Sequence, residues 1–156
     1  KDYDCVQGMY DKLCKVDEVI ELMGFDFKPE VPGVMEWSLE SGEVVKLKGK
    51  ADSIIEGANG KYLVDLKTTA KPLDEWVRNA KWMYAQQAYL YAEIFDCAEF
   101  YFLVIEKEFP YEVGIYKASD AFLEFGAREL DKSINLYEKL FLNGEFRPYY
   151  AHVGEL

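Results

Sequence analysis

The stretch from Gly49 to Thr69, GKADSIIEGANGKYLVDLKTT, constrains the fold most strongly, because two apolar runs flank a Gly-containing turn. Runs of this kind, separated by turn residues, predict a β-hairpin whose two strands pair antiparallel. Such a hairpin must bury its apolar side chains against another layer. The same strands nevertheless carry Asp52, Asp65 and Lys67, and these three charges need a physical explanation.

The register of the hairpin decides whether the three charged residues share a face. Opposed residues of an antiparallel pair have a constant index sum, and side chains alternate between the two faces. A turn centred on residues 58–59 gives a sum of 117 and opposes Asp52 to Asp65. A turn at residues 59–60 gives a sum of 119 and opposes Asp52 to Lys67. Either register places the three residues on one face, whereas an even sum would separate them.

Two interpretations of these charges remain open at this point. Opposed carboxylates repel each other and need a cation, which Lys67 can supply in an ordinary solvated ion pair on an outer face. The strand YLVDLK is strongly apolar, however, and this predicts a place inside the sheet, where unpaired acids are costly. Asp52, Asp65 and the Leu66 carbonyl offer the oxygen ligands that Mg²⁺ prefers. Lys67 would then hold the attacking water and the developing charge.

Composition restricts the class of protein. The 156 residues are half apolar and 16% aromatic, which predicts one domain spanning residues 1–156. No apolar run approaches the roughly 18 residues of a membrane span, so we expect a cytoplasmic protein without a membrane partner. The net charge of −11 disfavours nonspecific binding to DNA except through a local basic patch or metal ions. The cysteines lack metal-site spacing and predict buried free thiols: Cys5, Cys14 and Cys97.

The pattern of apolar residues predicts a mixed α/β fold in the order helix, strands, helix, strands, helix. The first helix spans residues 2–23, and Pro29 and Pro32 then break the chain. Residues 73–95 contain no glycine and predict one long amphipathic helix. The last helix starts at Ser119 or Asp120 and runs to Leu142, with Pro148 preventing its continuation. The remaining predicted elements are an antiparallel meander of strands at 34–41, 42–55 and 61–68, and two strands at 99–109 and 112–118.

The ordered charged and polar residues resemble the PD-(D/E)xK nuclease superfamily. Asp52, then Asp65-Leu66-Lys67, then Gln87 and Tyr91 follow its order D, (D/E)-x-K, Q-x-x-x-Y, whose last element marks the RecB-like branch. Within that branch the segments GKADSII, VDLKTTAKPLDEW, YAQQAYLY and FYFLVIEKEFPYEVGIYKAS are similar to the RecE-type phage and prophage exonuclease, exonuclease VIII. The resemblance implies a restriction-endonuclease-like core, in which the meander and two further strands form a mixed β-sheet flanked by α-helices.

The resemblance also implies a role for each matching residue. Asp52 and Asp65 would bind Mg²⁺ or Mn²⁺ together with the Leu66 carbonyl oxygen. Lys67 would position or activate the attacking water. These roles make Asp52, Asp65 and Lys67 the predicted catalytic residues.

Residues outside the hairpin carry weaker signals. Gln87 and Tyr91 lie four apart on one helix face, where the family uses them to orient the lysine or contact DNA, although an ordinary amphipathic helix has the same spacing. Glu36 matches an acid that precedes the meander in RecE-type chains, or is simply solvated. Family members also carry a histidine ligand in an N-terminal helix. Since His152 fits no such motif, we expect that ligand upstream of Lys1.

Three lysines precede Asp52 with the same parity, in VKLKGKAD: Lys46, Lys48 and Lys50. An unbulged strand would line them up with the metal site as a track for the DNA backbone, in which Lys50 lies nearest. Lysines also protect exposed edge strands from pairing, and the two explanations stay open. Phosphate contacts of this kind follow a backbone without reading its sequence.

Three functions follow from these observations. The first is a metal-dependent exonuclease of linear double-stranded DNA, for which the resemblance implies 5′ to 3′ hydrolysis, 3′ single strands for recombination, a single-strand annealing partner and a tetrameric homo-oligomer. The second is another RecB-like nuclease, such as a Cas4-like protein, although the scattered cysteines disfavour its iron–sulfur cluster. The third is a catalytically silent fold relative acting as a binding or assembly module, motivated by the missing histidine and the net charge.

Overall fold

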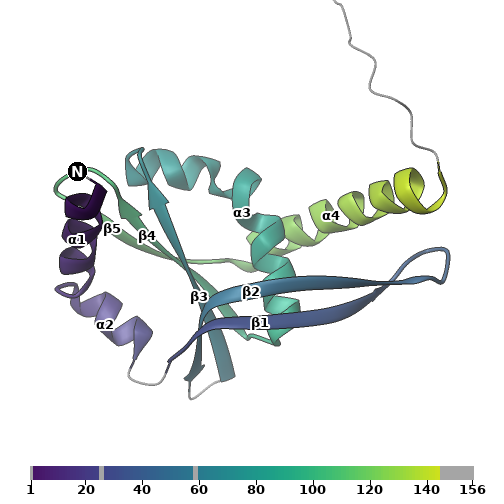
Figure 1. The fold of residues 1–156 in the computed structure, drawn as a ribbon, viewed down its shortest axis with the longest axis horizontal. Helices are drawn as coiled ribbons and strands as arrows, with labels where there is room; N and C mark the ends of the chain where they lie inside the picture. The colour runs from purple at the N-terminus through teal and green to yellow at the C-terminus, as the bar shows by residue number, and fades with distance from the viewer. Residues whose placement is uncertain (1, 25–26, 58–59, 145–156) are drawn as a thin grey trace, which may run out of the picture.

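A computed structural model describes residues 2–24, 27–57 and 60–144, arranged around one five-stranded mixed sheet (Figure 1). The strands follow one another across the sheet in chain order. All neighbours are antiparallel except the third and fourth, which are parallel. The predicted meander, extended by two further strands, is therefore confirmed. The strands are β1 (Phe27–Ser38), β2 (Val44–Gly57), β3 (Gly60–Thr69), β4 (Glu99–Glu106) and β5 (Val113–Lys117).

Helices cover both faces of the sheet. On one face α2 (Asp17–Met23) packs on β3 and β4 through Val19, and α1 (Asp2–Leu13) lies beside it. On the other face α3 (Leu73–Phe95) connects the parallel strands β3 and β4, as a crossover helix must. Packed on α3 is α4 (Asp120–Tyr137), which continues as a π-helical turn, Glu138–Leu142. No helix in the described part of the chain is long and apolar enough to cross a membrane.

The central strands are buried on both faces, and this places the charged triplet inside the molecule. Leu63 and Phe102 face the core beneath α3, whereas the adjacent Val64 and Leu103 face α2. This alternation is the pleat of a two-sided strand. Asp65, between such neighbours, therefore lies in the interior, as the apolar character of its strand predicts.

The ends of the long helices follow from local chemistry. α3 begins after Pro72 with Asp74 and Glu75 in its first turn, where acidic side chains complement the helix dipole. The Ser119 hydroxyl caps α4 by accepting a hydrogen bond from the Phe122 N–H, which confirms the predicted start. α4 lies so close to α3 that a Cβ at Gly126 would stand 2.0 Å from the Ala85 carbonyl oxygen. The bounds predicted for α3 are confirmed, and Pro148 lies outside the described residues.

The single helix predicted for residues 2–23 is wrong. The chain leaves the first helix after Leu13 and starts the second at Asp17. Val16 between them is extended, and Asp17 and Glu18 supply the acidic first turn that favours a new helix start. The break gives two short helices in place of one long rod, and both can then lie against the twisted sheet.

Two further local predictions are wrong. Pro29 and Pro32 do not end the structured chain but lie within β1, which begins at Phe27. β1 is the edge of the sheet, and proline is tolerated there because its missing N–H can face solvent. The cysteines are free as predicted, but none is fully buried, since Cys5 and Cys97 are half-buried and Cys14 is exposed.

Candidate active site

The two strands of the hairpin diverge at the predicted acids. β2 and β3 pair with an index sum of 117, as one predicted register requires, but within the described strands their ladder stops at Ser53 and Val64. Beyond that pair β2 stays beside β1, while β3 stays beside β4. Backbone groups freed at such a fork need other partners. Asp52 supplies one, because its Oδ2 accepts a hydrogen bond from the Leu66 N–H at 2.9 Å.

Asp65 is held by two side chains on the face toward α3. Its side chain is only 2% exposed, and its Oδ1 accepts a hydrogen bond from Gln87 Nε2 at 3.0 Å. Its Oδ2 lies 2.5 Å from Lys67 Nζ. The Lys67 ammonium in turn lies 5.0 Å from the centre of the Tyr84 ring, a cation–π contact that holds it near the carboxylate. The structure therefore brings together Asp65, Lys67 and Gln87 as predicted.

The electrostatic balance at Asp65 favours the approach of further positive charge. Burial raises the pKa of the Asp65 carboxyl above its ordinary value. The hydrogen bond and charge of Lys67, and the hydrogen bond from Gln87, lower that pKa without compensating for burial, and the negative charge of Asp52 raises it again. The ionised carboxylate is therefore under-neutralised by the protein alone. A divalent cation between the acids would favour the charged form.

The side-chain alternation of β2 changes phase at Asp52. Ala51 and Ile54 both pack in the core beneath α3, whereas Ser53 between them lines the opposite face. The facing residue of β1, Glu30, has a left-handed φ of 55° and is missing from the regular ladder, which pairs the residues on either side of it. This irregularity lets the Asp52 carboxylate reach the Leu66 N–H across the fork. The index sum of the β1–β2 pairs is 82 on both sides of Asp52, so β2 has no bulge. The prediction that Asp52 shares one face with Asp65 and Lys67 is wrong, because those two side chains face α3, whereas Asp52 lines the opposite face with Ser53.

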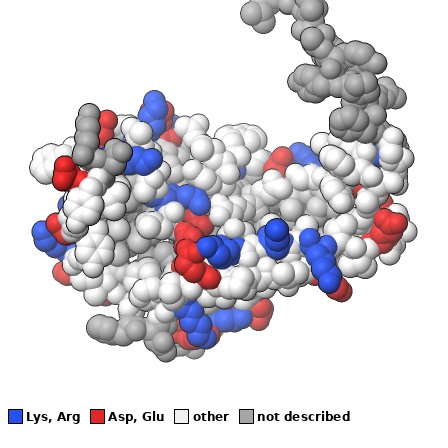
Figure 2. Space-filling view, in the orientation of Figure 1, with Lys and Arg blue, Asp and Glu red and all other residues white. Residues whose placement is uncertain are grey.

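The phase change also separates the lysines from Lys67. Lys46, Lys48 and Lys50 occupy exposed positions of β2, while the alternate residues, including Val45 and Leu47, face the core near α4. Figure 2 shows basic side chains in a row over the β1–β2 ribbon, with acidic side chains at the end of the row farther from the β1–β2 turn. The row of lysines therefore leads along the solvent-exposed face toward Asp52, and not toward Lys67 on the face covered by α3.

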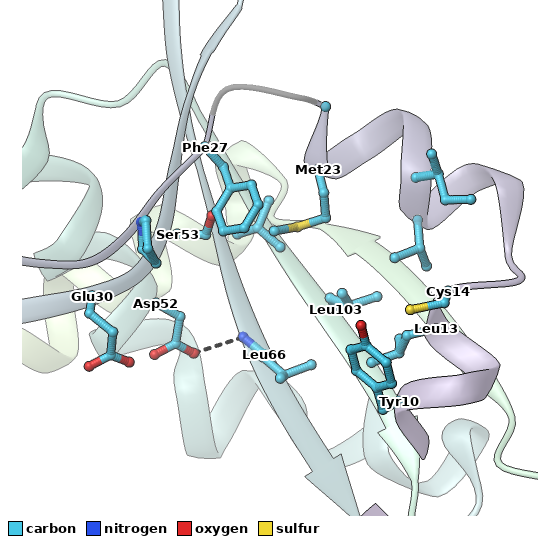
Figure 3. Close-up of a pocket in the computed structure, with 15 residues that line it drawn as sticks. Tyr10, Leu13, Cys14, Met23, Phe27, Glu30, Asp52, Ser53, Leu66 and Leu103 are labelled. Atoms are coloured by element: carbon cyan, nitrogen blue, oxygen red, sulfur yellow. Dashed lines mark hydrogen bonds between the residues drawn. The ribbon is translucent and has the colours of Figure 1, made fainter. Parts of the chain in front are cut away.

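Glu30 is a site residue that the sequence analysis missed. Figure 3 shows its carboxylate beside that of Asp52, and it forms an ion pair with Lys50. The β1–β2 pairs have an index sum of 82, so a register assigned to this hairpin would have opposed Glu30 to Asp52. Glu36, the acid singled out from the sequence, pairs with Lys46 and lies six residues farther along β1, roughly 20 Å away at the rise of a strand.

The two predicted helix residues reach different strands. Gln87 contacts Asp65 on β3. Tyr91, one turn later, packs on β2, where a Cβ at Gly49 would come within 2.7 Å of its ring. Lys50 follows Gly49 in β2. The hydrogen bond to Glu30 raises the pKa of Lys50 above its ordinary value, and the nearby Tyr91 hydroxyl raises that pKa slightly further. Tyr91 therefore supports the strand that carries Lys50 and Asp52.

The donor atoms of the site fit a hard divalent cation that keeps part of its water shell. Within residues 2–24, 27–57 and 60–144, no three His, Cys, Asp or Glu side chains converge to hold an ion. Mg²⁺ needs only one or two carboxylates besides water and phosphate oxygens, and Asp52 and Asp65 meet that need. The buried Asp65 Oδ2 contacts only the Lys67 ammonium among the described residues, and a carboxylate oxygen has a second lone pair with which it can bind an ion. His152 lies outside the described residues.

Replacing Gln87 by leucine is expected to lower the affinity for Mg²⁺ by about 10- to 100-fold, the usual cost of losing a partner that orients a metal ligand. The substitution removes the hydrogen bond that fixes Asp65 and lowers its pKa. Calorimetric titration with Mg²⁺ measures the change. Gln86→Leu is the matched control, because the Gln86 amide contacts Ser133 instead. Equal affinities in the two variants would contradict the role of Gln87.

Comparison with known proteins gives one family and one fold. Residues 35–155 match a family described as a PDDEXK-like domain of unknown function. No curated protein matches the sequence. A solved structure from Eubacterium rectale, described as a "Putative exonuclease", is similar over 94% of this chain with a TM-score of 0.74 and 21% identity. The chain spans 56% of that protein. The structure of SSO0001 is similar over 87% of this chain and 66% of its own, with a TM-score of 0.52 and 19% identity.

Proposed function

Because the chain belongs to the PDDEXK-like family and has its restriction-endonuclease-like fold, we propose that it is a metal-dependent nuclease that hydrolyses linear double-stranded DNA. One observation carries the proposal. The fork between β2 and β3 sets a buried carboxylate, Asp65, against the ammonium of Lys67, and Asp52 lies close enough for its charge to raise the pKa of Asp65. An acid in this environment is suited to binding a cation.

Each residue then has a defined task. Asp52, Asp65 and the Leu66 carbonyl oxygen would hold Mg²⁺ or Mn²⁺. When bound, such an ion supplies a more acidic water and neutralises charge on the phosphate. Lys67 donates hydrogen bonds to the attacking water and to the phosphate oxygens, and so stabilises the charge that develops during attack. Gln87 keeps the Asp65 carboxylate in one orientation through its 3.0 Å hydrogen bond.

The finer assignment is an exonuclease of RecE type, acting 5′ to 3′ in the cytoplasm to expose 3′ single strands for recombination. The motif order in the sequence supports it, as does the fold shared with a protein described as a "Putative exonuclease". The lysine row along β2 suits a DNA backbone that runs toward Asp52. A single-strand annealing protein and a ring-shaped tetramer belong to the same proposal.

Incubation of the natural full-length protein with linear duplex and with closed circular DNA tests the assignment. With Mg²⁺, we expect loss of the linear form only, and a 5′-labelled duplex should release its label first. EDTA and the variant Asp65→Asn control for a contaminating nuclease. Cutting of both forms would favour an endonuclease of the Cas4-like kind, and binding without hydrolysis would favour a catalytically silent module.

A further inference from the structure

A mostly apolar pocket of about 650 Å³ lies on the face of the sheet opposite α3, between α1, α2 and the strands (Figure 3). Its volume is within the roughly 300–1,000 Å³ typical of small-ligand sites. The lining residues come from the two helices and the sheet, among them Leu13 of α1, Val19 and Met23 of α2, and Val64 and Leu103 of the sheet. The catalytic tasks described above use its rim, at Asp52 and Leu66, but not the space behind it.

One buried polar group faces this pocket without a partner. Ser53 is 4% exposed, and its Oγ has no hydrogen-bond partner among the described residues. Figure 3 shows the Ser53 side chain directed toward Phe27 within the pocket. A buried hydroxyl without a partner is costly, and a shift of the side chains that cover it would let it both donate to and accept from the polar edge of a ligand. The pocket therefore offers apolar walls and one orienting group.

The pocket adjoins the proposed metal ligands. Asp52 and Leu66 both line it, and their mutual hydrogen bond lies at its rim beside Glu30 (Figure 3). A phosphate bound to a cation that Asp52 and the Leu66 carbonyl would hold lies at this rim, so the rest of its nucleotide would lie at the mouth of the pocket. The ligand most directly presented to this space is thus part of the nucleotide being cleaved.

The chemistry of the pocket selects which part of a nucleotide enters. The carboxylates of Glu30 and Asp52 at the rim repel a free anion. Tyr10 and Phe27 expose aromatic rings at the pocket, being 62% and 43% accessible, and rings of this kind stack on the flat faces of bases. A neutral heterocycle with a polar edge meets all of these conditions.

We propose that this pocket receives an unstacked nucleobase of the substrate strand, next to the phosphate that the cation at Asp52 would hold. The proposal rests on the nuclease function proposed above. Stacking on aromatic side chains is tolerant of base identity, and a single hydroxyl reads little sequence, so the pocket would accept any of the four bases. It would hold the end of the strand unpaired while hydrolysis takes place.

Duplexes that carry either a normal or an abasic nucleotide at the 5′ end test the proposal. The protein for this test is the natural full-length protein carrying Lys67→Ala, because this variant is expected to bind the metal without rapid turnover. Fluorescence anisotropy in Mg²⁺ measures how tightly it binds each duplex. We expect the normal end to bind about tenfold more tightly, within the range for one stacked base. Ile20→Asp, at a half-exposed position lining the pocket, should abolish this preference.

Val34→Asp is the matched control, because it adds the same charge at an exposed position of β1 outside the pocket. Val34→Asp should keep the tenfold preference for the normal end. If Val34→Asp also lost that preference, general charge repulsion would explain the effect of Ile20→Asp, and the proposal would be overturned. Equal binding of the two ends without either substitution would also overturn it. If neither duplex is bound or cut, the nuclease function itself is wrong and the pocket proposal falls with it.

Alkylation of Cys14, an exposed thiol of the pocket, gives a readout independent of activity. Peptide-resolved mass spectrometry should show that the normal duplex slows its reaction with a maleimide more than the abasic duplex does. A thiol that is unreactive with and without DNA would mean that another part of the natural chain fills the pocket, which contradicts the proposal.

Discussion

Replacing Lys67 by alanine is expected to lower turnover by at least about 10²-fold while Mg²⁺ still binds. The ammonium lies 2.5 Å from Asp65 Oδ2, so it is positioned to stabilise charge that appears only in the transition state. Its removal takes away a positive charge beside the metal ligands and leaves the Asp65 carboxylate to the ion. Single-turnover hydrolysis of a labelled linear duplex, together with Mg²⁺ titration, measures the two effects separately.

Two controls separate charge from packing at this position. Lys67→Met keeps an unbranched stem beside the Tyr84 ring and should be as inactive as Lys67→Ala. Lys71→Ala, in an exposed ion pair with Glu75, should leave turnover unchanged. Full activity of Lys67→Ala would contradict the assigned role, and so would complete loss of its Mg²⁺ binding.

Replacing Asp65 by asparagine is expected to abolish hydrolysis, by on the order of 10³-fold, without destabilising the metal-free protein. The amide keeps the shape of the carboxylate and the contact with Gln87 but loses the charge that binds the cation. Burial and Asp52 both oppose ionisation of Asp65, so removing its charge relieves an unfavourable interaction that the Lys67 ion pair does not fully offset. The melting temperature in EDTA should therefore hold or rise.

Asp74→Asn is the matched control, because it removes an exposed carboxylate from an i,i+4 pair with Arg78 on α3. Such a pair contributes only about 0.3–0.5 kcal/mol, and activity should be unaffected. Thermal melts in EDTA and initial rates of hydrolysis in Mg²⁺ distinguish the cases. A clear loss of metal-free stability in Asp65→Asn with normal hydrolysis is the result expected if Asp65 and Lys67 form only a structural ion pair.

The parts of the fold predicted correctly from the sequence are those that local pattern decides. The apolar alternation of β2 and β3 requires an odd index sum, the turn residues allow 117 or 119, and the structure adopts 117. The bounds of α3 follow from Pro72, the acidic first turn and an amphipathic run without glycine. The strand through Pro29 and Pro32 was missed because proline is acceptable only at a sheet edge, and the edge is a property of the assembled sheet.

The site was predicted less completely, since part of it depends on competition between strands. Asp65 and Lys67 lie two apart on one strand, so they share a face, and Gln87 was placed beside them by the family resemblance; the structure brings the three together. The fork at Asp52 arises because β2 stays with β1 while β3 stays with β4, which no local pattern states. Glu30 enters the site only through that pairing and its left-handed backbone.

The most direct test of the metal-binding nuclease site is the Mg²⁺ dependence of unfolding in the natural full-length protein. An ion that binds only the folded state stabilises it by about 2.7 kcal/mol at 100 times its dissociation constant. We expect Mg²⁺ to raise the melting temperature of wild type and of Lys67→Ala, and to leave that of Asp65→Asn unchanged. Wild-type protein whose melting temperature is the same in saturating Mg²⁺ and in EDTA would contradict the metal-binding site.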